Sequence, residues 1–515
     1  MKQKNNWRLS RRDFLKAIPY TIAAGTLAAC TEAGILEKKG KNTLEPTIII
    51  DGNILHQTLD GFGATTMTLA HTYEALPQDT LGELRSTVIQ KVYQEVGLNT
   101  GNIDLTVHEK SSTAVEPSQI IGLELDVKRV ESVKTLLLDL AEPYGFTDYY
   151  FGKINTRWGS TWLHDLMRED YERFLDTCAE YLTAIMVYWR DQHGIVPRLL
   201  MPFNEPLSGN RELADGNAKD IANILKCAGA RLRQEGFDQV KFIVPNDETE
   251  EKTLQSISVI LNDGEARQYV GAIGYHPYPY GSIYASVPNI LKTSGIGKPD
   301  NDRLKIRATL ADFARKTNLP LWMTEVSHPE VDPRSFDHLR GLAIHIHDEL
   351  VYANASAYFA MNNMWDLTTH RDHFKNDDIY SEADTVVLAN NETKEVMITG
   401  MGYAIGHYAR WMNPGSIRVE ATCDDPLLLV TAFVDQGQSR LSMVVINNAD
   451  KVKKVQFNIQ NLKLIKFLTG ERSTGTDPFP ASYWQSLTSW QPKNMQNFAV
   501  DFPGLSVTSL GVDIQ

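Results

Sequence analysis

Residues 198–206 read RLLMPFNEP in the printed sequence. An uninterrupted apolar run begins at Leu199 and ends at two polar residues, Asn204 and Glu205, which are followed by a proline. A short apolar run bounded by a turn signal is typical of a strand that is buried on both faces, as in a parallel sheet. Asn204 and Glu205 would then stand at the carboxyl end of the strand, because a proline cannot continue the hydrogen-bonded ladder.

Similar runs recur between about residues 60 and 365 and alternate with segments of helical period. The eight runs that we expect to be strands are 60–66, 100–106, 149–157, 198–204, 241–246, 270–276, 319–325 and 355–363. Between them, segments such as 79–96 and 169–192 place apolar residues on one face of a helix. Eight strands alternating with helices predict an α/β protein whose parallel sheet closes into a (β/α)8 TIM barrel, which we expect over residues 59–404.

After about residue 405 the pattern changes to strands that follow one another without helices. Examples are SIRVEA at 416–421, LLLVTAFVD at 427–435 and SRLSMVVINNA at 439–449. This pattern predicts an antiparallel β-sandwich over residues 405–515, appended to the barrel. The early run 46–58 precedes the barrel, and we expect it to join the sandwich.

The N-terminus is expected to be separate from the fold. SRRDFLK at 10–16 resembles a twin-arginine export signal, and LAAC at 27–30 resembles a bacterial lipobox, whose Cys30 would be lipidated after cleavage. Residues 1–30 are therefore interpreted as an export signal, and 31–45 as a polar tether. We expect a periplasmic or cell-surface lipoprotein held to the membrane by this lipid anchor alone. The alternative is an ordinary cytoplasmic amphipathic start.

The formal net charge of −13 makes sequence-independent binding to nucleic acid a poor hypothesis, because such binding relies on Lys and Arg against phosphates. No phosphate-binding GxxxxGK[ST] loop and no CxxC pair occurs in the sequence. HEKSS at 108–112 lacks the second histidine of a zinc-binding HExxH motif. We expect no cofactor, no metal and no nucleic-acid partner.

In a TIM barrel the chemistry lies at the carboxyl ends of the strands, where Glu205 ends the fourth run and Glu325 ends the seventh. Either glutamate alone more often belongs to a loop salt bridge or a helix cap. Two glutamates on strands that face each other across a barrel suggest glycoside hydrolysis, in which a protonated carboxyl releases the leaving oxygen and an ionised one attacks the anomeric carbon. A retaining mechanism needs the two carboxyl groups about 5–5.5 Å apart.

Four segments carry a resemblance to a known family. FNEP at 203–206 and WMTE at 322–325 resemble the catalytic strand ends of retaining (β/α)8-barrel glycosidases. QTLDGFGAT at 57–65 and GYAIGHYARWMNPGSIRV at 402–419 resemble the first strand and the barrel-to-sandwich crossing of glycoside hydrolase family 30. The resemblance runs in order from about residue 46 to residue 515.

The resemblance implies a retaining β-glycoside hydrolase that cleaves an oligo- or polysaccharide through a covalent glycosyl-enzyme intermediate. It implies that Glu205 is the general acid/base, that Glu325 is the nucleophile and that Asn204 hydrogen-bonds the sugar 2-hydroxyl. The carbohydrate substrate would be the main partner of the protein.

Aromatic and histidine side chains near the strand ends are candidates for sugar binding, because flat rings stack on sugar faces. The candidates are Trp158, Trp162, Tyr275, His276, Tyr278 and Trp365. Each has a structural alternative: the tryptophans as core residues, His276 as a hydrogen-bonded structural histidine and Tyr278 as a loop aromatic.

Two segments depart from the family pattern. GNIDL at 101–105 places Asn102 where the family commonly has an arginine, and Asp104 adds a negative charge nearby. Arg157, within NTRWGSTWLHD at 155–165, is a candidate for the missing cation. These departures point to a divergent subgroup of the family and leave open a catalytically weak or inactive cell-surface glycan-binding protein on a glycosidase scaffold. A third hypothesis, independent of them, is an enzyme that transfers sugars to acceptors other than water.

Overall fold

The computed structural model describes eleven parts of the chain. They are residues 45–65, 78–106, 131, 133–153, 161–207, 212–213, 215–278, 301–327, 332–367, 384–466 and 468–515. Residues Glu45–Gln515 form one compact unit. The predicted export signal with Cys30, the tether, Arg157 and Trp158 lie outside the described residues. Within those residues, no helix combines the length and the apolar character needed to cross a membrane.

Within the described residues, eight parallel strands close into a barrel in chain order, and β2 pairs with β9 to complete the ring. The strands are β2 (Gly61–Thr65), β3 (Thr100–Thr106), β4 (Asp148–Lys153), β5 (Leu199–Leu200), β6 (Lys241–Asp247), β7 (Val270–Tyr275), β8 (Leu321–Met323) and β9 (Ala357–Ala360). The TIM barrel predicted from the alternating runs is confirmed.

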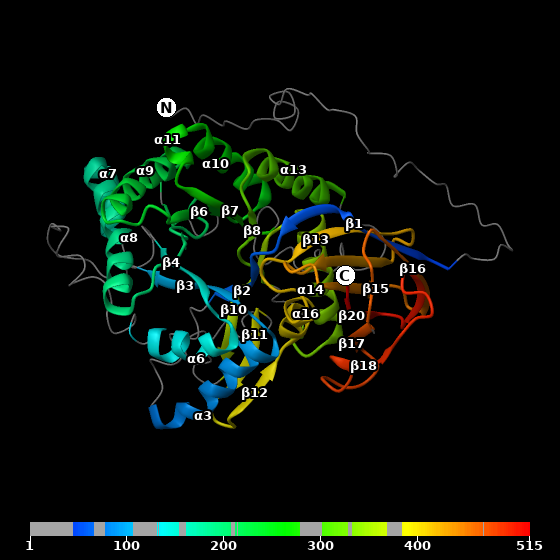
Figure 1. Cartoon of the computed structure of the whole chain (residues 1–515). Coiled ribbons are helices and arrows are strands. Elements are labelled where there is room, and N and C mark those ends of the chain that lie inside the picture. The colour runs from blue at the N-terminus through cyan, green and yellow to red at the C-terminus, as the bar shows by residue number, and fades with distance from the viewer. Residues whose placement is uncertain are drawn as a thin grey trace, which may run out of the picture. The chain divides into compact units, whose positions relative to one another are not determined.

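Helices follow the strands and lie on the outer side of the barrel, as α9, α10 and α13 do in Figure 1. The helical segments are α3 (Gln78–Ile89), η1 (Gln90–Glu95), η2 (Lys134–Leu138), α6 (Asp139–Ala141), η3 (Glu142–Tyr144), α7 (Thr161–Glu169), α8 (Tyr171–His193), α9 (Ala218–Gln234), α10 (Glu250–Asn262), α11 (Gly264–Arg267), α13 (Asn301–Thr317), α14 (Phe336–Val351) and α16 (Gly400–Ala409). Their ends follow local chemistry. The side chain of Asp170 accepts a hydrogen bond from the backbone N–H of Arg173 at the start of α8, and Gly194 ends that helix in the left-handed region, at φ 68°.

The inside of the barrel is a packed core. The rings of Tyr150 and Trp322 lie edge to face at 4.9 Å between centroids, and Phe359 packs against both of them. The indole N–H of Trp322 donates to Asp60, which directly precedes β2. Because β2 is parallel to the other strands, Asp60 marks the amino end of the barrel, which leaves the opposite end for chemistry.

The region after the last barrel strand differs from the prediction. The run 355–363 was expected to be one strand, but β9 ends at Ala360 and β10 (Asn362–Asp366) pairs outside the barrel. β10 forms a three-stranded sheet with β11 (Thr385–Asn390) and β12 (Glu395–Ile398). The break lies at Met361, whose backbone N–H donates to the carbonyl of Val326 at 3.0 Å instead of continuing the ladder.

The described C-terminal region and the early strand β1 make one nine-stranded sheet with the order β18-β17-β20-β15-β14-β13-β1-β16-β19. The strands are β1 (Thr47–Thr58), β13 (Ile417–Cys423), β14 (Leu428–Val434), β15 (Arg440–Asn447), β16 (Lys453–Gln460), β17 (Leu468–Thr474), β18 (Gln485–Trp490), β19 (Asn497–Phe502) and β20 (Ser506–Asp513). The sheet is antiparallel except where β1 runs parallel to β16. An appended, mostly antiparallel β domain is confirmed, with this one parallel pair as a departure from the prediction.

Strand β15 shows how this sheet packs. Leu441, Met443 and Val445 belong to the apolar core of the sheet itself. The alternate residues Val444 and Ile446 belong to the core that includes the barrel helices. Because successive side chains point to opposite faces of a strand, β15 buries both faces, and its sequence is therefore almost continuously apolar.

Candidate active site

Glu205 follows the short strand β5 and is completely buried. Its backbone has φ 49°, in the left-handed region, which costs a residue other than glycine about 1–2 kcal/mol. Its backbone N–H donates to the carbonyl of Asn246 at 2.9 Å, and this bond helps to offset that cost. Strained backbone that is held by its surroundings is often found at functional sites.

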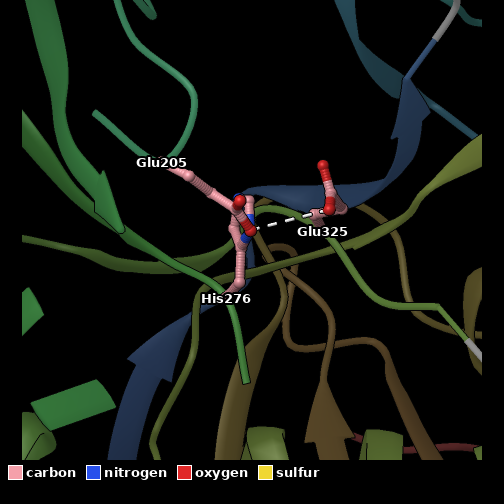
Figure 2. A group of neighbouring side chains, drawn as sticks. All are labelled: Glu205, His276 and Glu325. Carbon is pink, nitrogen blue, oxygen red and sulfur yellow. Dashed lines mark hydrogen bonds and ion pairs between the residues drawn. The ribbon is translucent and has the colours of Figure 1, made fainter. Parts of the chain in front are cut away.

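The side chains of Glu205, His276 and Glu325 converge from the ends of three strands, β5, β7 and β8 (Figure 2). Nδ1 of His276 lies 3.0 Å from Oε1 of Glu205 and 3.6 Å from Oε1 of Glu325. One oxygen of each carboxylate and one ring nitrogen of His276 lie within 4.8 Å of one another. The two glutamates that the sequence placed on separate strands are therefore close together, with one histidine in contact with both.

Glu325 is the more accessible of the two carboxylates: 16% of its side chain is exposed, against none for Glu205. The hydroxyl of Tyr278 donates to Oε1 of Glu325 at 3.1 Å. Burial raises the pKa of Tyr278, and the charge of Glu325 raises it further. Tyr278 therefore keeps its proton and acts as a hydrogen-bond donor to Glu325.

His276 is fully buried between charges. Burial alone would lower its pKa, but the charge of Glu325 and the hydrogen bond to Glu205 outweigh burial, so the pKa of His276 is raised. The imidazolium form is therefore favoured when both carboxylates are ionised. This arrangement can exchange a proton between His276 and Glu205 at hydrogen-bond distance. In outline, the same three side chains could also coordinate a divalent cation.

Asn204 is held from two sides. Its backbone N–H donates to a carboxylate oxygen of buried Glu212 at 2.6 Å. Its side-chain Oδ1 accepts a hydrogen bond from the amide of Asn246 at 3.3 Å. This second contact orients the amide of Asn204 and leaves its NH2 group as the donor.

The sequence analysis did not single out Asn246 and Glu212. Asn246 carries the same signal as Asn204, because it ends the apolar run KFIVPN at 241–246. Glu212 has no such signal, since it follows no run that we interpreted as a strand.

Tyr275 lies on the other side of β7 from His276, as expected for adjacent residues of a strand. Its hydroxyl donates to buried Glu349 of α14, so Tyr275 belongs to the packing between barrel and helices and not to the convergence at the strand ends. We therefore leave Tyr275 out of the proposed sugar-binding set.

The two described tryptophans occupy different places. Trp162 lies on α7, is partly buried and packs against the main apolar core. Trp365 lies on β10 with 8% of its surface exposed. Asn102 lies on β3, where it pairs with Thr65 of β2.

No family model matches the chain. A curated relative, glucuronoxylanase XynC from Bacillus subtilis, is 27% identical over 214 residues. That segment makes up 40% of this chain and 40% of the relative, so the chain spans less than half of the length of the curated relative.

Solved structures match nearly the whole chain, and two of them illustrate the similarity. A glycoside hydrolase family 30 subfamily 8 xylanase from Clostridium acetobutylicum has a TM-score of 0.63 at 19% identity, with 91% of this chain and 99% of that chain covered. A conserved exported protein from Bacteroides fragilis has a TM-score of 0.66 at 14% identity, with 90% and 100% covered. At these identities the two structures establish the shared fold.

The matched glucuronoxylanase and xylanase give no support to the alternative of a glycan-binding protein without catalysis. The chain is thus similar to the curated glucuronoxylanase over part of its length, and it shares the fold of the solved family 30 xylanase.

Proposed function

We propose that the chain is a retaining β-glycoside hydrolase that cleaves an oligo- or polysaccharide by double displacement. The observation that carries the proposal is the pair Glu205 and Glu325, whose nearest oxygens lie within 4.8 Å at the ends of β5 and β8. Retaining enzymes hold the carboxyl groups about 5–5.5 Å apart, whereas inverting enzymes need about 6.5–9.5 Å to admit a water molecule. The observed spacing favours retention.

In this proposal Glu325 is the nucleophile and Glu205 is the acid/base. In the first step a carboxylate oxygen of Glu325 bonds to the anomeric carbon, the glycosidic C–O bond breaks, and Glu205 gives its proton to the leaving oxygen. In the second step Glu205 takes a proton from water, which attacks the anomeric carbon and releases Glu325. The partial exposure of Glu325 and its bond from Tyr278 suit a carboxylate that must meet substrate.

Asn204 is proposed to donate to the sugar 2-hydroxyl, because the amide of Asn246 donates to its Oδ1 and leaves its NH2 group as the donor. Trp365, Trp162 and Trp158 remain candidates for stacking on the sugar. Xylan is the first substrate to test, because the curated relative and a solved neighbour are named as a glucuronoxylanase and a xylanase.

We also propose export and lipidation at Cys30. The support is the order of the two N-terminal motifs and the similarity of the chain to a conserved exported protein. Metabolic labelling with a radioactive fatty acid should mark the wild-type chain and not Cys30→Ala. Equal labelling of both would contradict the proposed anchor.

The test of the catalytic proposal is hydrolysis of xylan and of a panel of aryl β-glycosides and β-linked polysaccharides. Proton NMR of the first product should show the β anomer, because two displacements retain configuration. Glu205→Ala should regain turnover of an activated aryl glycoside with azide and give a β-glycosyl azide, whereas Glu325→Ala with azide should give the α product.

Glu420→Gln is the matched control for these variants. Glu420 lies on β13 and pairs with His56 at 2.7 Å, within the β domain, so its loss should leave turnover unchanged. An α product from the wild type would overturn retention. Unchanged turnover in Glu325→Ala would overturn the assignment of the nucleophile.

A further inference from the structure

Asn246 joins three strand ends that lie around the two carboxylates. It is the penultimate residue of β6 and is 1% exposed. Its side-chain NH2 donates to the carbonyl of Phe203 at 2.9 Å and to Oδ1 of Asn204 at 3.3 Å. Its backbone carbonyl accepts the N–H of Glu205 at 2.9 Å. Asn246 therefore binds three consecutive residues of the segment that ends in the proposed acid/base.

The side-chain oxygen of Asn246 contacts the end of β8, which carries the proposed nucleophile Glu325. Its Oδ1 accepts the hydroxyl proton of Thr324, the residue immediately before Glu325. That hydroxyl also contacts the carbonyl of Tyr275 at 3.0 Å, and the N–H of Thr324 donates to the same carbonyl at 2.9 Å. One amide side chain thus connects the residues preceding both carboxylates.

The contact between Asn246 and Thr324 crosses strand β7, which lies between β6 and β8. Gly274 of β7 leaves the space for it: a Cβ at this position would lie 3.2 Å from Oδ1 of Asn246 and 3.5 Å from Cγ2 of Thr324. The backbone of Asn246 has φ 63°, in the left-handed region that asparagine tolerates better than most residues. The amide side chain of Asn246, its backbone conformation and the absence of a side chain at Gly274 together permit the contact with Thr324.

We propose that Asn246 is a positioning residue that sets the separation of Glu205 and Glu325, and with it the rate of both displacements. This inference rests on the proposed glycosidase function. Asn246 does not touch the reacting atoms; it acts through Asn204, Glu205 and Thr324. Because Asn246 is buried, with its hydrogen bonds to Phe203 and Thr324, the loss of these bonds lets the two strand ends move relative to each other.

The decisive variants are Thr324→Val and Thr324→Ser. Valine removes the hydroxyl and keeps the shape, whereas serine keeps the hydroxyl. For Thr324→Val we expect kcat to fall about 10- to 100-fold, since a misplacement of about 1 Å can cost 100-fold. KM should change little, and Thr324→Ser should restore kcat to near the wild-type value.

Asn246→Ala tests the same link from the other side. The double variant should be no slower than Asn246→Ala alone, because Asn246→Ala already removes the contact that Thr324→Val removes. Ser256→Ala is the control for the loss of a buried hydroxyl nearby, since Ser256 donates to Asp247 at 2.9 Å and not to the link. Ser256→Ala should lower the melting temperature and leave kcat unchanged. If Asn246 had only a structural role, Asn246→Ala would show this same pattern.

Two outcomes separate the inference from the function on which it rests. If Glu325→Ala is inactive and Thr324→Val keeps the wild-type kcat, the role of Asn246 is wrong and the glycosidase stands. If the wild type cleaves no glycoside, the proposed function falls, and crystal structures still test the link. The separation of the two carboxylates should then increase in Thr324→Val and not in Thr324→Ser; an equal separation in both would overturn the inference.

Discussion

Two buried groups of ionisable side chains lie on opposite sides of strand β7, and their compositions differ. The strand-end cluster contains Glu205, His276 and Glu325. The Arg307 cluster, behind the barrel wall, contains Arg307, His345 and Glu349. Tyr275, the last residue of β7, contacts the Arg307 cluster, and His276, the next residue, belongs to the strand-end cluster.

The difference lies in the cation. Arg307 pairs with Glu349 and also contacts Glu250 at 3.4 Å and Asp348 at 3.6 Å. Burial alone would raise the pKa of Glu349, but the charge of Arg307 and the hydrogen bonds from His345 and Tyr275 lower it to about 2. Glu349 therefore stays ionised over the whole physiological range.

In the strand-end cluster a cationic partner of the two carboxylates is His276, whose imidazole can exist with or without its proton, unlike a guanidinium. A permanent guanidinium makes a buried carboxylate a structural element, whereas a titratable partner lets a carboxylate gain and lose a proton. The comparison teaches that burial alone does not identify a catalytic carboxylate. The kind of partner has to be examined as well.

The largest expected effect is that of Glu325→Gln in the strand-end cluster. Hydrolysis should fall by at least about 1,000-fold, because the covalent step loses its nucleophile. The free energy of unfolding in urea should stay the same or rise, since the substitution removes one of two neighbouring negative charges. A large loss of stability would make Glu325 resemble Glu349 and would break the comparison.

Arg307→Met should have the opposite profile. The variant leaves the carboxylate of Glu349 buried without the guanidinium of Arg307, which lowers the unfolding free energy by about 3–5 kcal/mol. The folded fraction should keep its kcat. Arg315→Met is the control on the same helix, since Arg315 is 72% exposed and its pair with Asp312 should contribute only about 0–1 kcal/mol.

Two other buried histidines, His347 and His407, sharpen the comparison, because among the described residues no carboxylate lies at hydrogen-bond distance from them. Burial, reinforced by the charge of Arg418, lowers the pKa of His347 to about 3. Burial, reinforced by Arg410, does the same for His407, which lies between the hydroxyls of Ser473 and Ser509. Both differ from His276, whose pKa is raised.

The sign of the pH effect follows from these directions. Below the unfolded-state pKa of about 6.5, His347 and His407 bind a proton in the unfolded chain, whereas in the folded chain the same buried side chains stay neutral. Their contribution is fully present above pH 6.5 and is lost as the pH falls toward 3. Each histidine should add about 1.4 kcal/mol per pH unit to the slope of unfolding free energy in that window. Urea titrations of His347→Gln at several pH values should give a slope of unfolding free energy against pH that is smaller by about 1.4 kcal/mol per pH unit. An unchanged slope would contradict the lowered pKa of His347.

The smallest effects should come from the two tyrosines. Tyr278→Phe removes one hydrogen bond to Glu325 and should lower kcat about tenfold, as expected for a contact of about 1.4 kcal/mol. Tyr275→Phe removes the bond to Glu349 and should lower the unfolding free energy by about 1–3 kcal/mol with kcat unchanged. The reverse pattern would place Tyr275 in the site after all.

The eight barrel strands were predictable because each buried strand of a parallel sheet is a short apolar run bounded by helical segments. The break at Met361 was not, because no turn residue such as Gly or Pro interrupts the run 355–363 where its hydrogen bonds change partner, from the barrel to β11. The parallel pairing of β1 with β16 was not predictable either. Strand direction depends on how distant segments approach, and the residue pattern of a single strand does not encode it.

The sequence by itself determined which residues stand at the strand ends, and thereby proposed Glu205 and Glu325 as a pair. Local patterns suffice for this, since each residue's place on its strand depends on its neighbours in the chain. Only the tertiary structure decided that His276 contacts both glutamates, that Tyr275 turns to Glu349, and that Asn246 links the two strand ends. Distances between side chains on different strands depend on barrel closure and packing, which no local pattern encodes.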